Sequence, residues 1–214
     1  MSEEADLREQ IVRIGADLFN RGLTHGASGN ISVLLSDGSM LITPTGVSLG
    51  CMEPADISLL DVKGRYLSGL QPTKEVSLHQ AFYATRAQKS RAVVHLHSCY
   101  SVAVSMLPDV DADDVFPPIT AYSVMLLGRV KLLPYFRPGD SAMGDAVRGL
   151  AGERSAVILA NHGPIVAAKD LTTAQFAMEE LEATAKLLLL TRGLGPKLLN
   201  AEQVFDLVQH FNLE

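Results

Sequence analysis

The segment AVVHLH at residues 92–97 is the clearest sequence signal for both a strand of the fold and a candidate site. Its β-branched and apolar residues predict a buried strand. Side chains at i and i+2 leave the same face of a strand, so His95 and His97 present two imidazoles side by side, while Val94 and Leu96 face the other way. Zinc prefers imidazole ligands, although an isolated pair of this kind is more often two hydrogen-bonded histidines. The segment alone therefore predicts only a candidate metal edge.

Two further residues strengthen the metal interpretation. His162 follows a second apolar strand, predicted at residues 156–160, and such strand ends are where a sheet displays site residues. Glu75 falls in the first turn of a helix predicted to begin near Thr73, where a carboxylate also interacts well with the helix dipole. Taken singly, a turn histidine and a dipole-stabilising carboxylate are the simpler interpretations. Together, three histidines and one carboxylate would fill a tetrahedral metal shell.

The remaining histidines and one cysteine are weaker candidates. By strand alternation Cys99 lies on the face of the histidine pair, and cysteine is a good zinc ligand. We expect it instead to be a small buried residue at the end of the strand, because four better candidates exist. His25, His79 and His210 have no partner visible in the sequence, so we expect structural or surface roles for them.

Hydrophobic periodicity predicts a mixed α/β architecture. A first helix carries the apolar face from Leu7 to Leu18 and is capped by Gly22. Two hairpins are expected over residues 31–43 and 57–67, each with a glycine in its turn. Further helices are expected from Thr73 through Tyr83, over residues 172–192 and after Asn200, with a less regular stretch between residues 98 and 155. This mixture favours an α/β/α sandwich with a central, mainly antiparallel sheet.

The amino-acid composition limits the kinds of molecule that the protein is expected to bind. The 214 residues, 47% of them hydrophobic, can bury one core and show no linker, so we expect a single domain over residues 1–214. A formal net charge of -6 gives no basic surface for nucleic acid or acidic membranes. Apolar runs such as residues 187–190 fall far short of the about 20 residues that cross a bilayer. With an acidic N-terminus and two cysteines, we expect a cytoplasmic protein.

Five short motifs, in this order, make the chain resemble the class II aldolase and adducin head family. They are HGASGN at residues 25–30, TPTG at 43–46, TKE at 73–75, HLH at 95–97 and NHG at 161–163. The resemblance implies one zinc ion per subunit, or manganese or cobalt in its place, held by Glu75, His95, His97 and His162. It also implies that Glu75 leaves the metal when the substrate chelates it and then acts as the acid/base.

The same resemblance implies a pocket for a substrate phosphate. Its residues would be Gly29, Asn30, Thr45, Gly46, Thr73 and Lys74. Glycine turns and a helix start expose backbone N–H groups, while threonine hydroxyls and a lysine supply further donors. Without the other motifs, the Gly-Asn and Thr-Gly pairs would be interpreted as ordinary turns. The family also uses tyrosines, in some cases from a neighbouring subunit, and Tyr122 is a weak candidate for that role.

Within the family, the chain is similar to 3-oxo-tetronate 4-phosphate decarboxylases in residues 69–76, 93–98, 134–140 and 178–182. This likeness implies a zinc-dependent carbon–carbon lyase of sugar-acid catabolism, which converts 3-oxo-tetronate 4-phosphate to dihydroxyacetone phosphate and carbon dioxide. The expected partner is thus a small phosphorylated sugar acid. The likeness also implies a homo-oligomer, with a tetramer as the expected state and active sites near subunit boundaries.

Three alternatives stay open at the level of sequence. The nearest is an aldolase that cleaves a sugar phosphate such as L-fuculose 1-phosphate, although such aldolases often carry two serines where this chain has Thr73 and Lys74. An epimerase of the same family is another, because it also breaks a carbon–carbon bond beside a carbonyl. A non-catalytic, adducin-like interaction domain would need no metal, and retention of all four candidate ligands argues against it.

Overall fold

A computed structural model describes residues 2–87, 89–211 and 213 of the chain. Its strands are β1 (Asn30–Leu34), β2 (Met40–Ile42), β3 (Ser58–Leu60), β4 (Tyr66–Ser68), β5 (Ala92–His95), β6 (Lys131–Leu133), β7 (Ala156–Leu159) and β8 (Gly163–Ala168). They form one eight-stranded sheet in the order β4-β3-β2-β1-β5-β8-β7-β6. Among the described strands, all neighbours pair antiparallel except β6 and β7, which are parallel. The predicted, mainly antiparallel sheet is confirmed.

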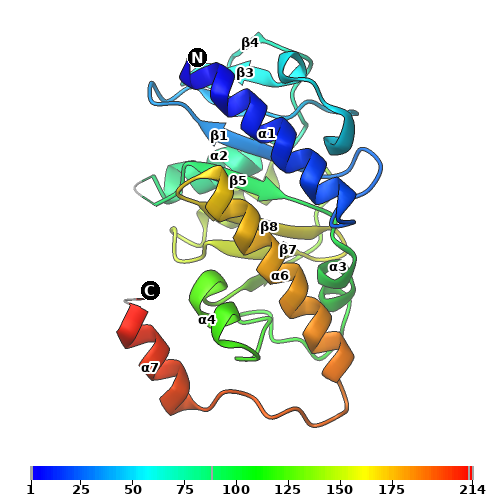
Figure 1. The fold of residues 1–214 in the computed structure, drawn as a ribbon, viewed down its shortest axis with the longest axis vertical. Coiled ribbons are helices and arrows are strands. Elements are labelled where there is room, and N and C mark those ends of the chain that lie inside the picture. The colour runs from blue at the N-terminus through cyan, green and yellow to red at the C-terminus, as the bar shows by residue number, and fades with distance from the viewer. Residues whose placement is uncertain (1, 88, 212, 214) are drawn as a thin grey trace.

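Helices cover both faces of this sheet (Figure 1). They are α1 (Glu3–Asn20), α2 (Val76–Thr85), α3 (Cys99–Ser105), α4 (Ala121–Leu127), α5 (Ala142–Arg148), α6 (Leu171–Thr191) and α7 (Ala201–Phe211), with short 3-10 turns at η1 (Leu49–Cys51) and η2 (Pro54–Asp56). Apolar residues of α1, α3, α4 and α6 pack with Val94 on one face, whereas those of α2 and α5 pack with Val93 on the other. This arrangement is the predicted α/β/α sandwich. No helix in the described ranges is long and apolar enough to span a bilayer.

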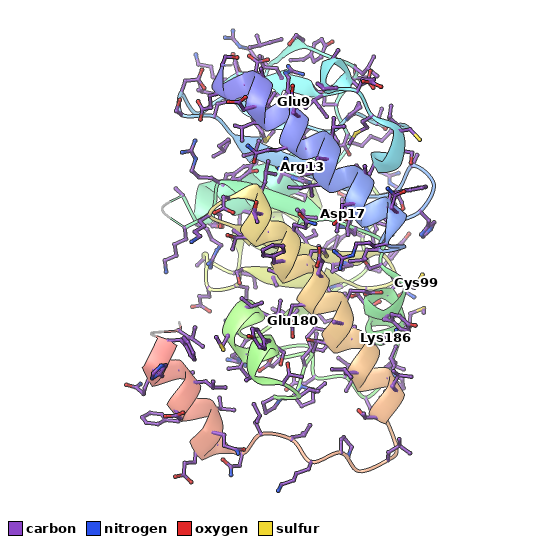
Figure 2. All side chains as sticks on the ribbon, in the orientation of Figure 1. Glu9, Arg13, Asp17, Cys99, Glu180 and Lys186 are labelled. Atoms are coloured by element: carbon purple, nitrogen blue, oxygen red, sulfur yellow. The ribbon has the colours of Figure 1, made fainter. Side chains whose placement is uncertain are left out.

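The long helices follow the predicted amphipathic pattern. In α1, Ile11 and Ile14 are buried against the sheet, while Glu9 and Arg13 lie on the exposed outer face (Figure 2). The first helix, the two hairpins, β7 and α6 are confirmed, with ends that differ by a residue or two. At the last helix, the Asn200 side chain accepts a hydrogen bond from the backbone of Gln203, as expected of a cap.

The second helix begins later than predicted, at Val76 rather than near Thr73. Thr73 donates its backbone N–H to the Thr43 carbonyl at 3.2 Å, and the Thr45 N–H donates to the Gln71 carbonyl at 2.9 Å. Residues 71–73 therefore run extended beside residues 43–45, and this tertiary pairing overrides their helix signal. Glu75 becomes the residue that precedes the helix instead of a member of its first turn.

The strand predicted over residues 92–97 ends at His95. Its neighbour β1 begins with Asn30 opposite His95, and β8 begins at Gly163, so little strand is left for the chain to pair with beyond this point. Alternation therefore does not extend to Cys99, which begins α3 and is exposed (Figure 2). The expectation that Cys99 is a small buried residue at a strand end is wrong.

The stretch predicted to be less regular contains α3, α4, β6 and α5. Each of these elements has three to seven residues, which is too short for hydrophobic periodicity to reveal it. The predicted single domain over residues 1–214 includes positions 1, 88, 212 and 214, which lie outside the described residues, and it stays a prediction.

Candidate metal and substrate site

Three imidazoles meet where β5 ends. His95 is the last residue of β5, His97 follows two residues later, and His162 lies in the turn between β7 and β8. Ring centroids are 5.1 Å apart for His95 and His97, 4.9 Å for His95 and His162, and 4.7 Å for His97 and His162. Candidate ligand atoms of the three residues all lie within 4.8 Å of one another. The structure thus brings together the three histidines singled out in the sequence.

The turn between β7 and β8 carries His162 to this position. Gly163 has a φ of 157°, and a Cβ added there would lie 2.1 Å from the carbonyl oxygen of Leu96. Only glycine allows so close an approach of the two backbones. The preceding residue, Asn161, has a φ of 56° and donates its backbone N–H to the Ser105 hydroxyl at 3.0 Å. Both features hold the turn against the end of β5.

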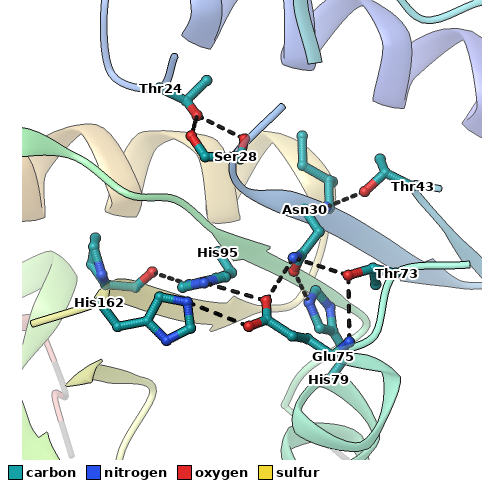
Figure 3. A network of polar contacts seen from close by, with 11 residues as sticks. Thr24, Ser28, Asn30, Thr43, Thr73, Glu75, His79, His95 and His162 are labelled. Atoms are coloured by element: carbon teal, nitrogen blue, oxygen red, sulfur yellow. Dashed lines mark hydrogen bonds and ion pairs between the residues drawn. The ribbon is translucent and has the colours of Figure 1, made fainter. Parts of the chain in front are cut away.

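Glu75, the fourth predicted ligand, faces the histidines from the start of α2 (Figure 3). Its side chain makes no capping hydrogen bond to the helix. Instead, Oε2 lies 3.4 Å from Nε2 of His95, and Oε1 lies 3.4 Å from Nε2 of His162. The residue is 6% exposed, so the carboxylate is taken out of water and placed between two imidazoles.

Several buried ring nitrogens of this centre have no hydrogen-bond partner among the described residues. Nδ1 of His95 donates to the carbonyl of Pro164 at 2.9 Å, which turns Nε2 of the same ring toward the centre. That Nε2 and both ring nitrogens of His162 are buried and have no hydrogen-bond partner among the described residues. Buried polar atoms without partners cost free energy, and here they face a carboxylate. A divalent cation such as zinc, which takes imidazole and carboxylate ligands, fits this donor set.

Electrostatics favour the protonation states that metal binding requires. Burial, followed by the neighbouring His95, lowers the pKa of His97 to about 3 and that of His162 to about 4. Burial alone would raise the pKa of Glu75, but His95 and the hydrogen bond from Asn30 outweigh it and lower that pKa below its ordinary value. Near neutral pH, both histidines are therefore neutral and Glu75 is ionised, as metal ligands must be.

A cleft of about 160 Å³ opens beside the histidines. All six residues predicted to bind phosphate line it: Gly29, Asn30, Thr45, Gly46, Thr73 and Lys74. Glu75, His97 and His162 line the same cleft. The candidate metal ligands and the candidate phosphate residues, which come from distant parts of the sequence, thus share one cavity.

Backbone contacts hold the walls of this cleft in place. The extended pairing of residues 71–73 with residues 43–45 sets the loop that carries Thr45 beside the loop that carries Lys74. Gly29 has a φ of 83°, and a Cβ added there would lie 2.9 Å from the carbonyl oxygen of His95. This glycine therefore lets the turn before β1 approach the end of β5. The Thr24 hydroxyl donates to the Ser28 carbonyl at 2.9 Å and steadies the same turn (Figure 3).

Pro138 and Gly139 in the cleft, and His79 behind it, were not predicted from the sequence as site residues. Pro138 and Gly139 line the cleft, with Gly139 directly beside Lys74, yet their segment was noted only as part of a family resemblance. Its Pro-Gly-Asp sequence is a turn signal, which is typical of site loops. His79, expected to have a structural or surface role, is buried and lies 2.5 Å from the Asn30 side chain. Its position four residues after Glu75, on the same helix face, was the signal that could have found it.

Other candidates lie away from the cleft. Tyr122 is on α4, is 63% exposed and does not line the cavity. Glu182 of α6, from another segment noted for its resemblance, accepts hydrogen bonds from the backbone N–H groups of Tyr100 and Ser101 at 2.8 and 2.9 Å. It thereby caps α3, which begins two residues after His97. Glu182 helps to fix where the chain turns after the histidine pair.

Comparison with known proteins agrees with this geometry. Residues 9–189 match the family model "Class II Aldolase and Adducin N-terminal domain", and the chain belongs to this family, whose enzymes are metal-dependent. A 3-oxo-tetronate 4-phosphate decarboxylase from Pectobacterium atrosepticum is 42% identical over 207 residues, which cover 97% of this chain and 94% of that protein.

A solved structure and a more distant relative are also similar to this chain. The crystal structure of YgbL from Escherichia coli, for which aldolase, epimerase and decarboxylase activities are all left open, matches with a TM-score of 0.93 at 42% identity, covering 96% of this chain and 99% of that one. An L-fuculose phosphate aldolase from Haemophilus influenzae is 33% identical over 206 residues, 94% of this chain and 91% of that protein. The predicted class II aldolase-like fold is confirmed.

Proposed function

We propose that the protein is a metal-dependent carbon–carbon lyase that decarboxylates 3-oxo-tetronate 4-phosphate to dihydroxyacetone phosphate and carbon dioxide in sugar-acid catabolism. The observation that carries this proposal is the single cleft shared by a histidine–carboxylate centre and by loops suited to a phosphate. The higher identity to a decarboxylase of this specificity than to an aldolase supports the choice of reaction.

Zinc is the proposed metal, one ion per subunit, with manganese or cobalt as substitutes. Glu75, His95, His97 and His162 would hold it, because their ligand atoms converge and Nε2 of His95 and both ring nitrogens of His162 have no other partner among the described residues. When bound, such a cation supplies Lewis acidity that stabilises negative charge developing on substrate oxygens.

Glu75 is the proposed acid/base. Decarboxylation breaks the bond between C1 and C2, releases carbon dioxide and leaves the electron pair on the remaining three carbons. One proton, taken ultimately from solvent, must then reach C2 to give dihydroxyacetone phosphate. Glu75 lines the cleft, is buried, and accepts a hydrogen bond of 2.8 Å from Asn30, so its carboxylate is placed to carry this proton once the substrate has taken its place on the metal.

Six other residues of the cleft are proposed to bind the phosphate. Gly29, Asn30, Thr45, Gly46, Thr73 and Lys74 would contribute backbone N–H groups, hydroxyls, an amide and one ammonium group. Lys74 is exposed, and its charge complements a phosphate at the mouth of the cleft. Fixing the phosphate would set the distance from the C1–C2 bond to Glu75.

An aldolase is the second candidate, because the H. influenzae relative is an L-fuculose phosphate aldolase and spans most of this chain. Aldol cleavage would use the same centre and differ in releasing an aldehyde instead of carbon dioxide. We also propose a homo-oligomer, a tetramer, on the basis of the family resemblance. Light scattering coupled to size-exclusion chromatography measures the subunit number, and a monomeric mass would contradict this part of the proposal.

The deciding experiment gives zinc-loaded protein two substrates in separate assays. Release of dihydroxyacetone phosphate from 3-oxo-tetronate 4-phosphate, without aldehyde release from L-fuculose 1-phosphate, is expected. The reverse result would make the protein an aldolase. Zinc content near zero, with no activity after addition of divalent ions, would instead favour a non-catalytic interaction domain.

A further inference from the structure

Behind Glu75 lies a buried chain of hydrogen bonds that the proposed function does not yet use. Asn30 donates from Nδ2 to Oε2 of Glu75 at 2.8 Å, and its Oδ1 lies 2.5 Å from Nε2 of His79. The chain continues from Nδ1 of His79 to the Ser32 hydroxyl at 2.7 Å and from there to the Tyr83 hydroxyl at 2.6 Å. Figure 3 shows the part that joins Glu75, Asn30 and His79. His79 and Ser32 are fully buried.

Regular secondary structure brings these groups together. Asn30 and Ser32 are two residues apart in β1, so their side chains leave the same face of the sheet. Glu75, His79 and Tyr83 follow one another at intervals of four along α2, so they lie on one face of the helix. The two faces oppose each other, and the alignment therefore depends on how α2 packs against β1.

In this series of hydrogen bonds, each group donates toward Glu75. An ionised carboxylate can only accept, so the Asn30 amide must turn its NH₂ group toward Glu75 and its oxygen toward His79. Nε2 of His79 must then carry the proton that Asn30 accepts. Burial lowers the pKa of His79 to about 3, so the ring is neutral and its Nδ1 accepts from the Ser32 hydroxyl. The Tyr83 hydroxyl is left to donate to Ser32.

The direction of these hydrogen bonds determines the orientation of the Asn30 amide. A flipped amide would place its oxygen 2.8 Å from a carboxylate oxygen and its NH₂ group against the N–H of His79. Both contacts would be repulsive. The hydroxyl of Thr73, 3.3 Å from Nδ2 of Asn30, provides a second and longer contact. The N–H of His79 Nε2 therefore holds the amide oxygen of Asn30 in the orientation that the ionised Glu75 requires, although His79 does not line the cleft.

We propose that His79 is a positioning residue: through the N–H of its Nε2 it orients Asn30, and Asn30 holds the Glu75 carboxylate toward His95 and His162. This inference rests on the proposed function only in giving Glu75 a role at the metal centre. It predicts that the Nε2 side of His79 matters for metal binding and turnover, whereas the Nδ1 side matters much less.

Two substitutions of His79, similar in size, test its Nε2 side and its Nδ1 side separately. His79→Gln places an amide nitrogen near the position of Nε2 and keeps a donor for Asn30. His79→Asn places an amide oxygen near the position of Nδ1, so it keeps the partner of Ser32 but leaves Asn30 without a donor. Zinc affinity, measured by competition with a chelating dye, and kcat are expected to fall about 10- to 100-fold for His79→Asn and to stay within a few-fold of wild type for His79→Gln.

Circular dichroism and thermal unfolding of both variants show whether they fold. Equal zinc affinities in two folded variants would overturn the proposal, as would greater loss in His79→Gln. Because zinc binding needs no substrate, an expected zinc result without decarboxylation would contradict only the proposed function. Nitrogen NMR of the wild-type imidazole tests the same idea if either variant does not fold. A neutral ring protonated on Nε2 is expected, and a ring protonated on Nδ1 would overturn the proposal.

Discussion

The Glu75 carboxylate lies between two neighbourhoods that are both buried but differ in their hydrogen bonding. On one side, Nε2 of His95 and both ring nitrogens of His162 have no hydrogen-bond partner among the described residues. On the other side, the side chains of Asn30 and His79 have partners for their polar groups. Unpaired buried nitrogens destabilise a protein unless a ligand binds them, whereas a paired network holds its members in place. The first side is thus suited to bind a metal and the second to position the carboxylate.

Glu75→Gln acts on both sides at once and is expected to have the largest effect. It removes a candidate metal ligand and the proposed acid/base, and kcat for decarboxylation is expected to fall by up to about 10⁴-fold. Binding of inorganic phosphate, measured by calorimetry, should change little, because the loops that would bind it are untouched. Turnover at the wild-type rate would remove Glu75 from the mechanism.

His95→Ala disrupts the unpaired side alone. Loss of this ligand is expected to lower bound zinc well below one ion per subunit and to reduce kcat by about 10³-fold, since a catalytic metal contributes several kcal/mol. Elemental analysis and thermal unfolding with and without a chelator measure the effect. Wild-type protein should lose thermal stability when chelator is added, whereas the variant should not respond. A full complement of zinc in the variant would contradict the proposed ligand set.

Lys74→Met tests the cleft wall rather than either neighbourhood of Glu75. Loss of one charge-assisted contact to phosphate is expected to raise KM about 10- to 100-fold while kcat changes less. The matched control is Lys63→Met, because Lys63 is also exposed but does not line the cleft. Equal KM values for the two variants would place the phosphate elsewhere.

The unpaired side of the site could largely be predicted from the sequence. His95 and His97 lie two residues apart in a segment with strand signals, and His162 follows another such segment. These local patterns predict the structure correctly because both segments form interior strands of the sheet, with a neighbour on each side. The structure brings the three histidines and Glu75 together, while their role as metal ligands stays a prediction.

The paired side could not be predicted in the same way. His79 meets Asn30 only because α2 packs across β1, and nothing in the local sequence specifies that register. The start of α2 depends equally on tertiary structure, since the pairing of residues 71–73 with residues 43–45 removes the first predicted turn. Sequence patterns find residues that share an element, whereas contacts between elements require the packed structure.

The last prediction concerns stability and has the smallest effect. The pKa of His79 is about 3 in the folded protein against an ordinary value of 6.5, so between these values the unfolded chain binds a proton that the folded protein does not. Stability therefore rises with pH across this window and falls as the pH is lowered from 7 to 5. This histidine is expected to lower the free energy of unfolding of the metal-free protein by about 1–2 kcal/mol over that change. His79→Gln has no group that titrates there, so urea unfolding of this variant should depend on pH less steeply by that amount. Identical slopes for the two proteins would mean that His79 binds a proton as readily in the folded protein as in the unfolded chain, so that burial does not hold its ring neutral.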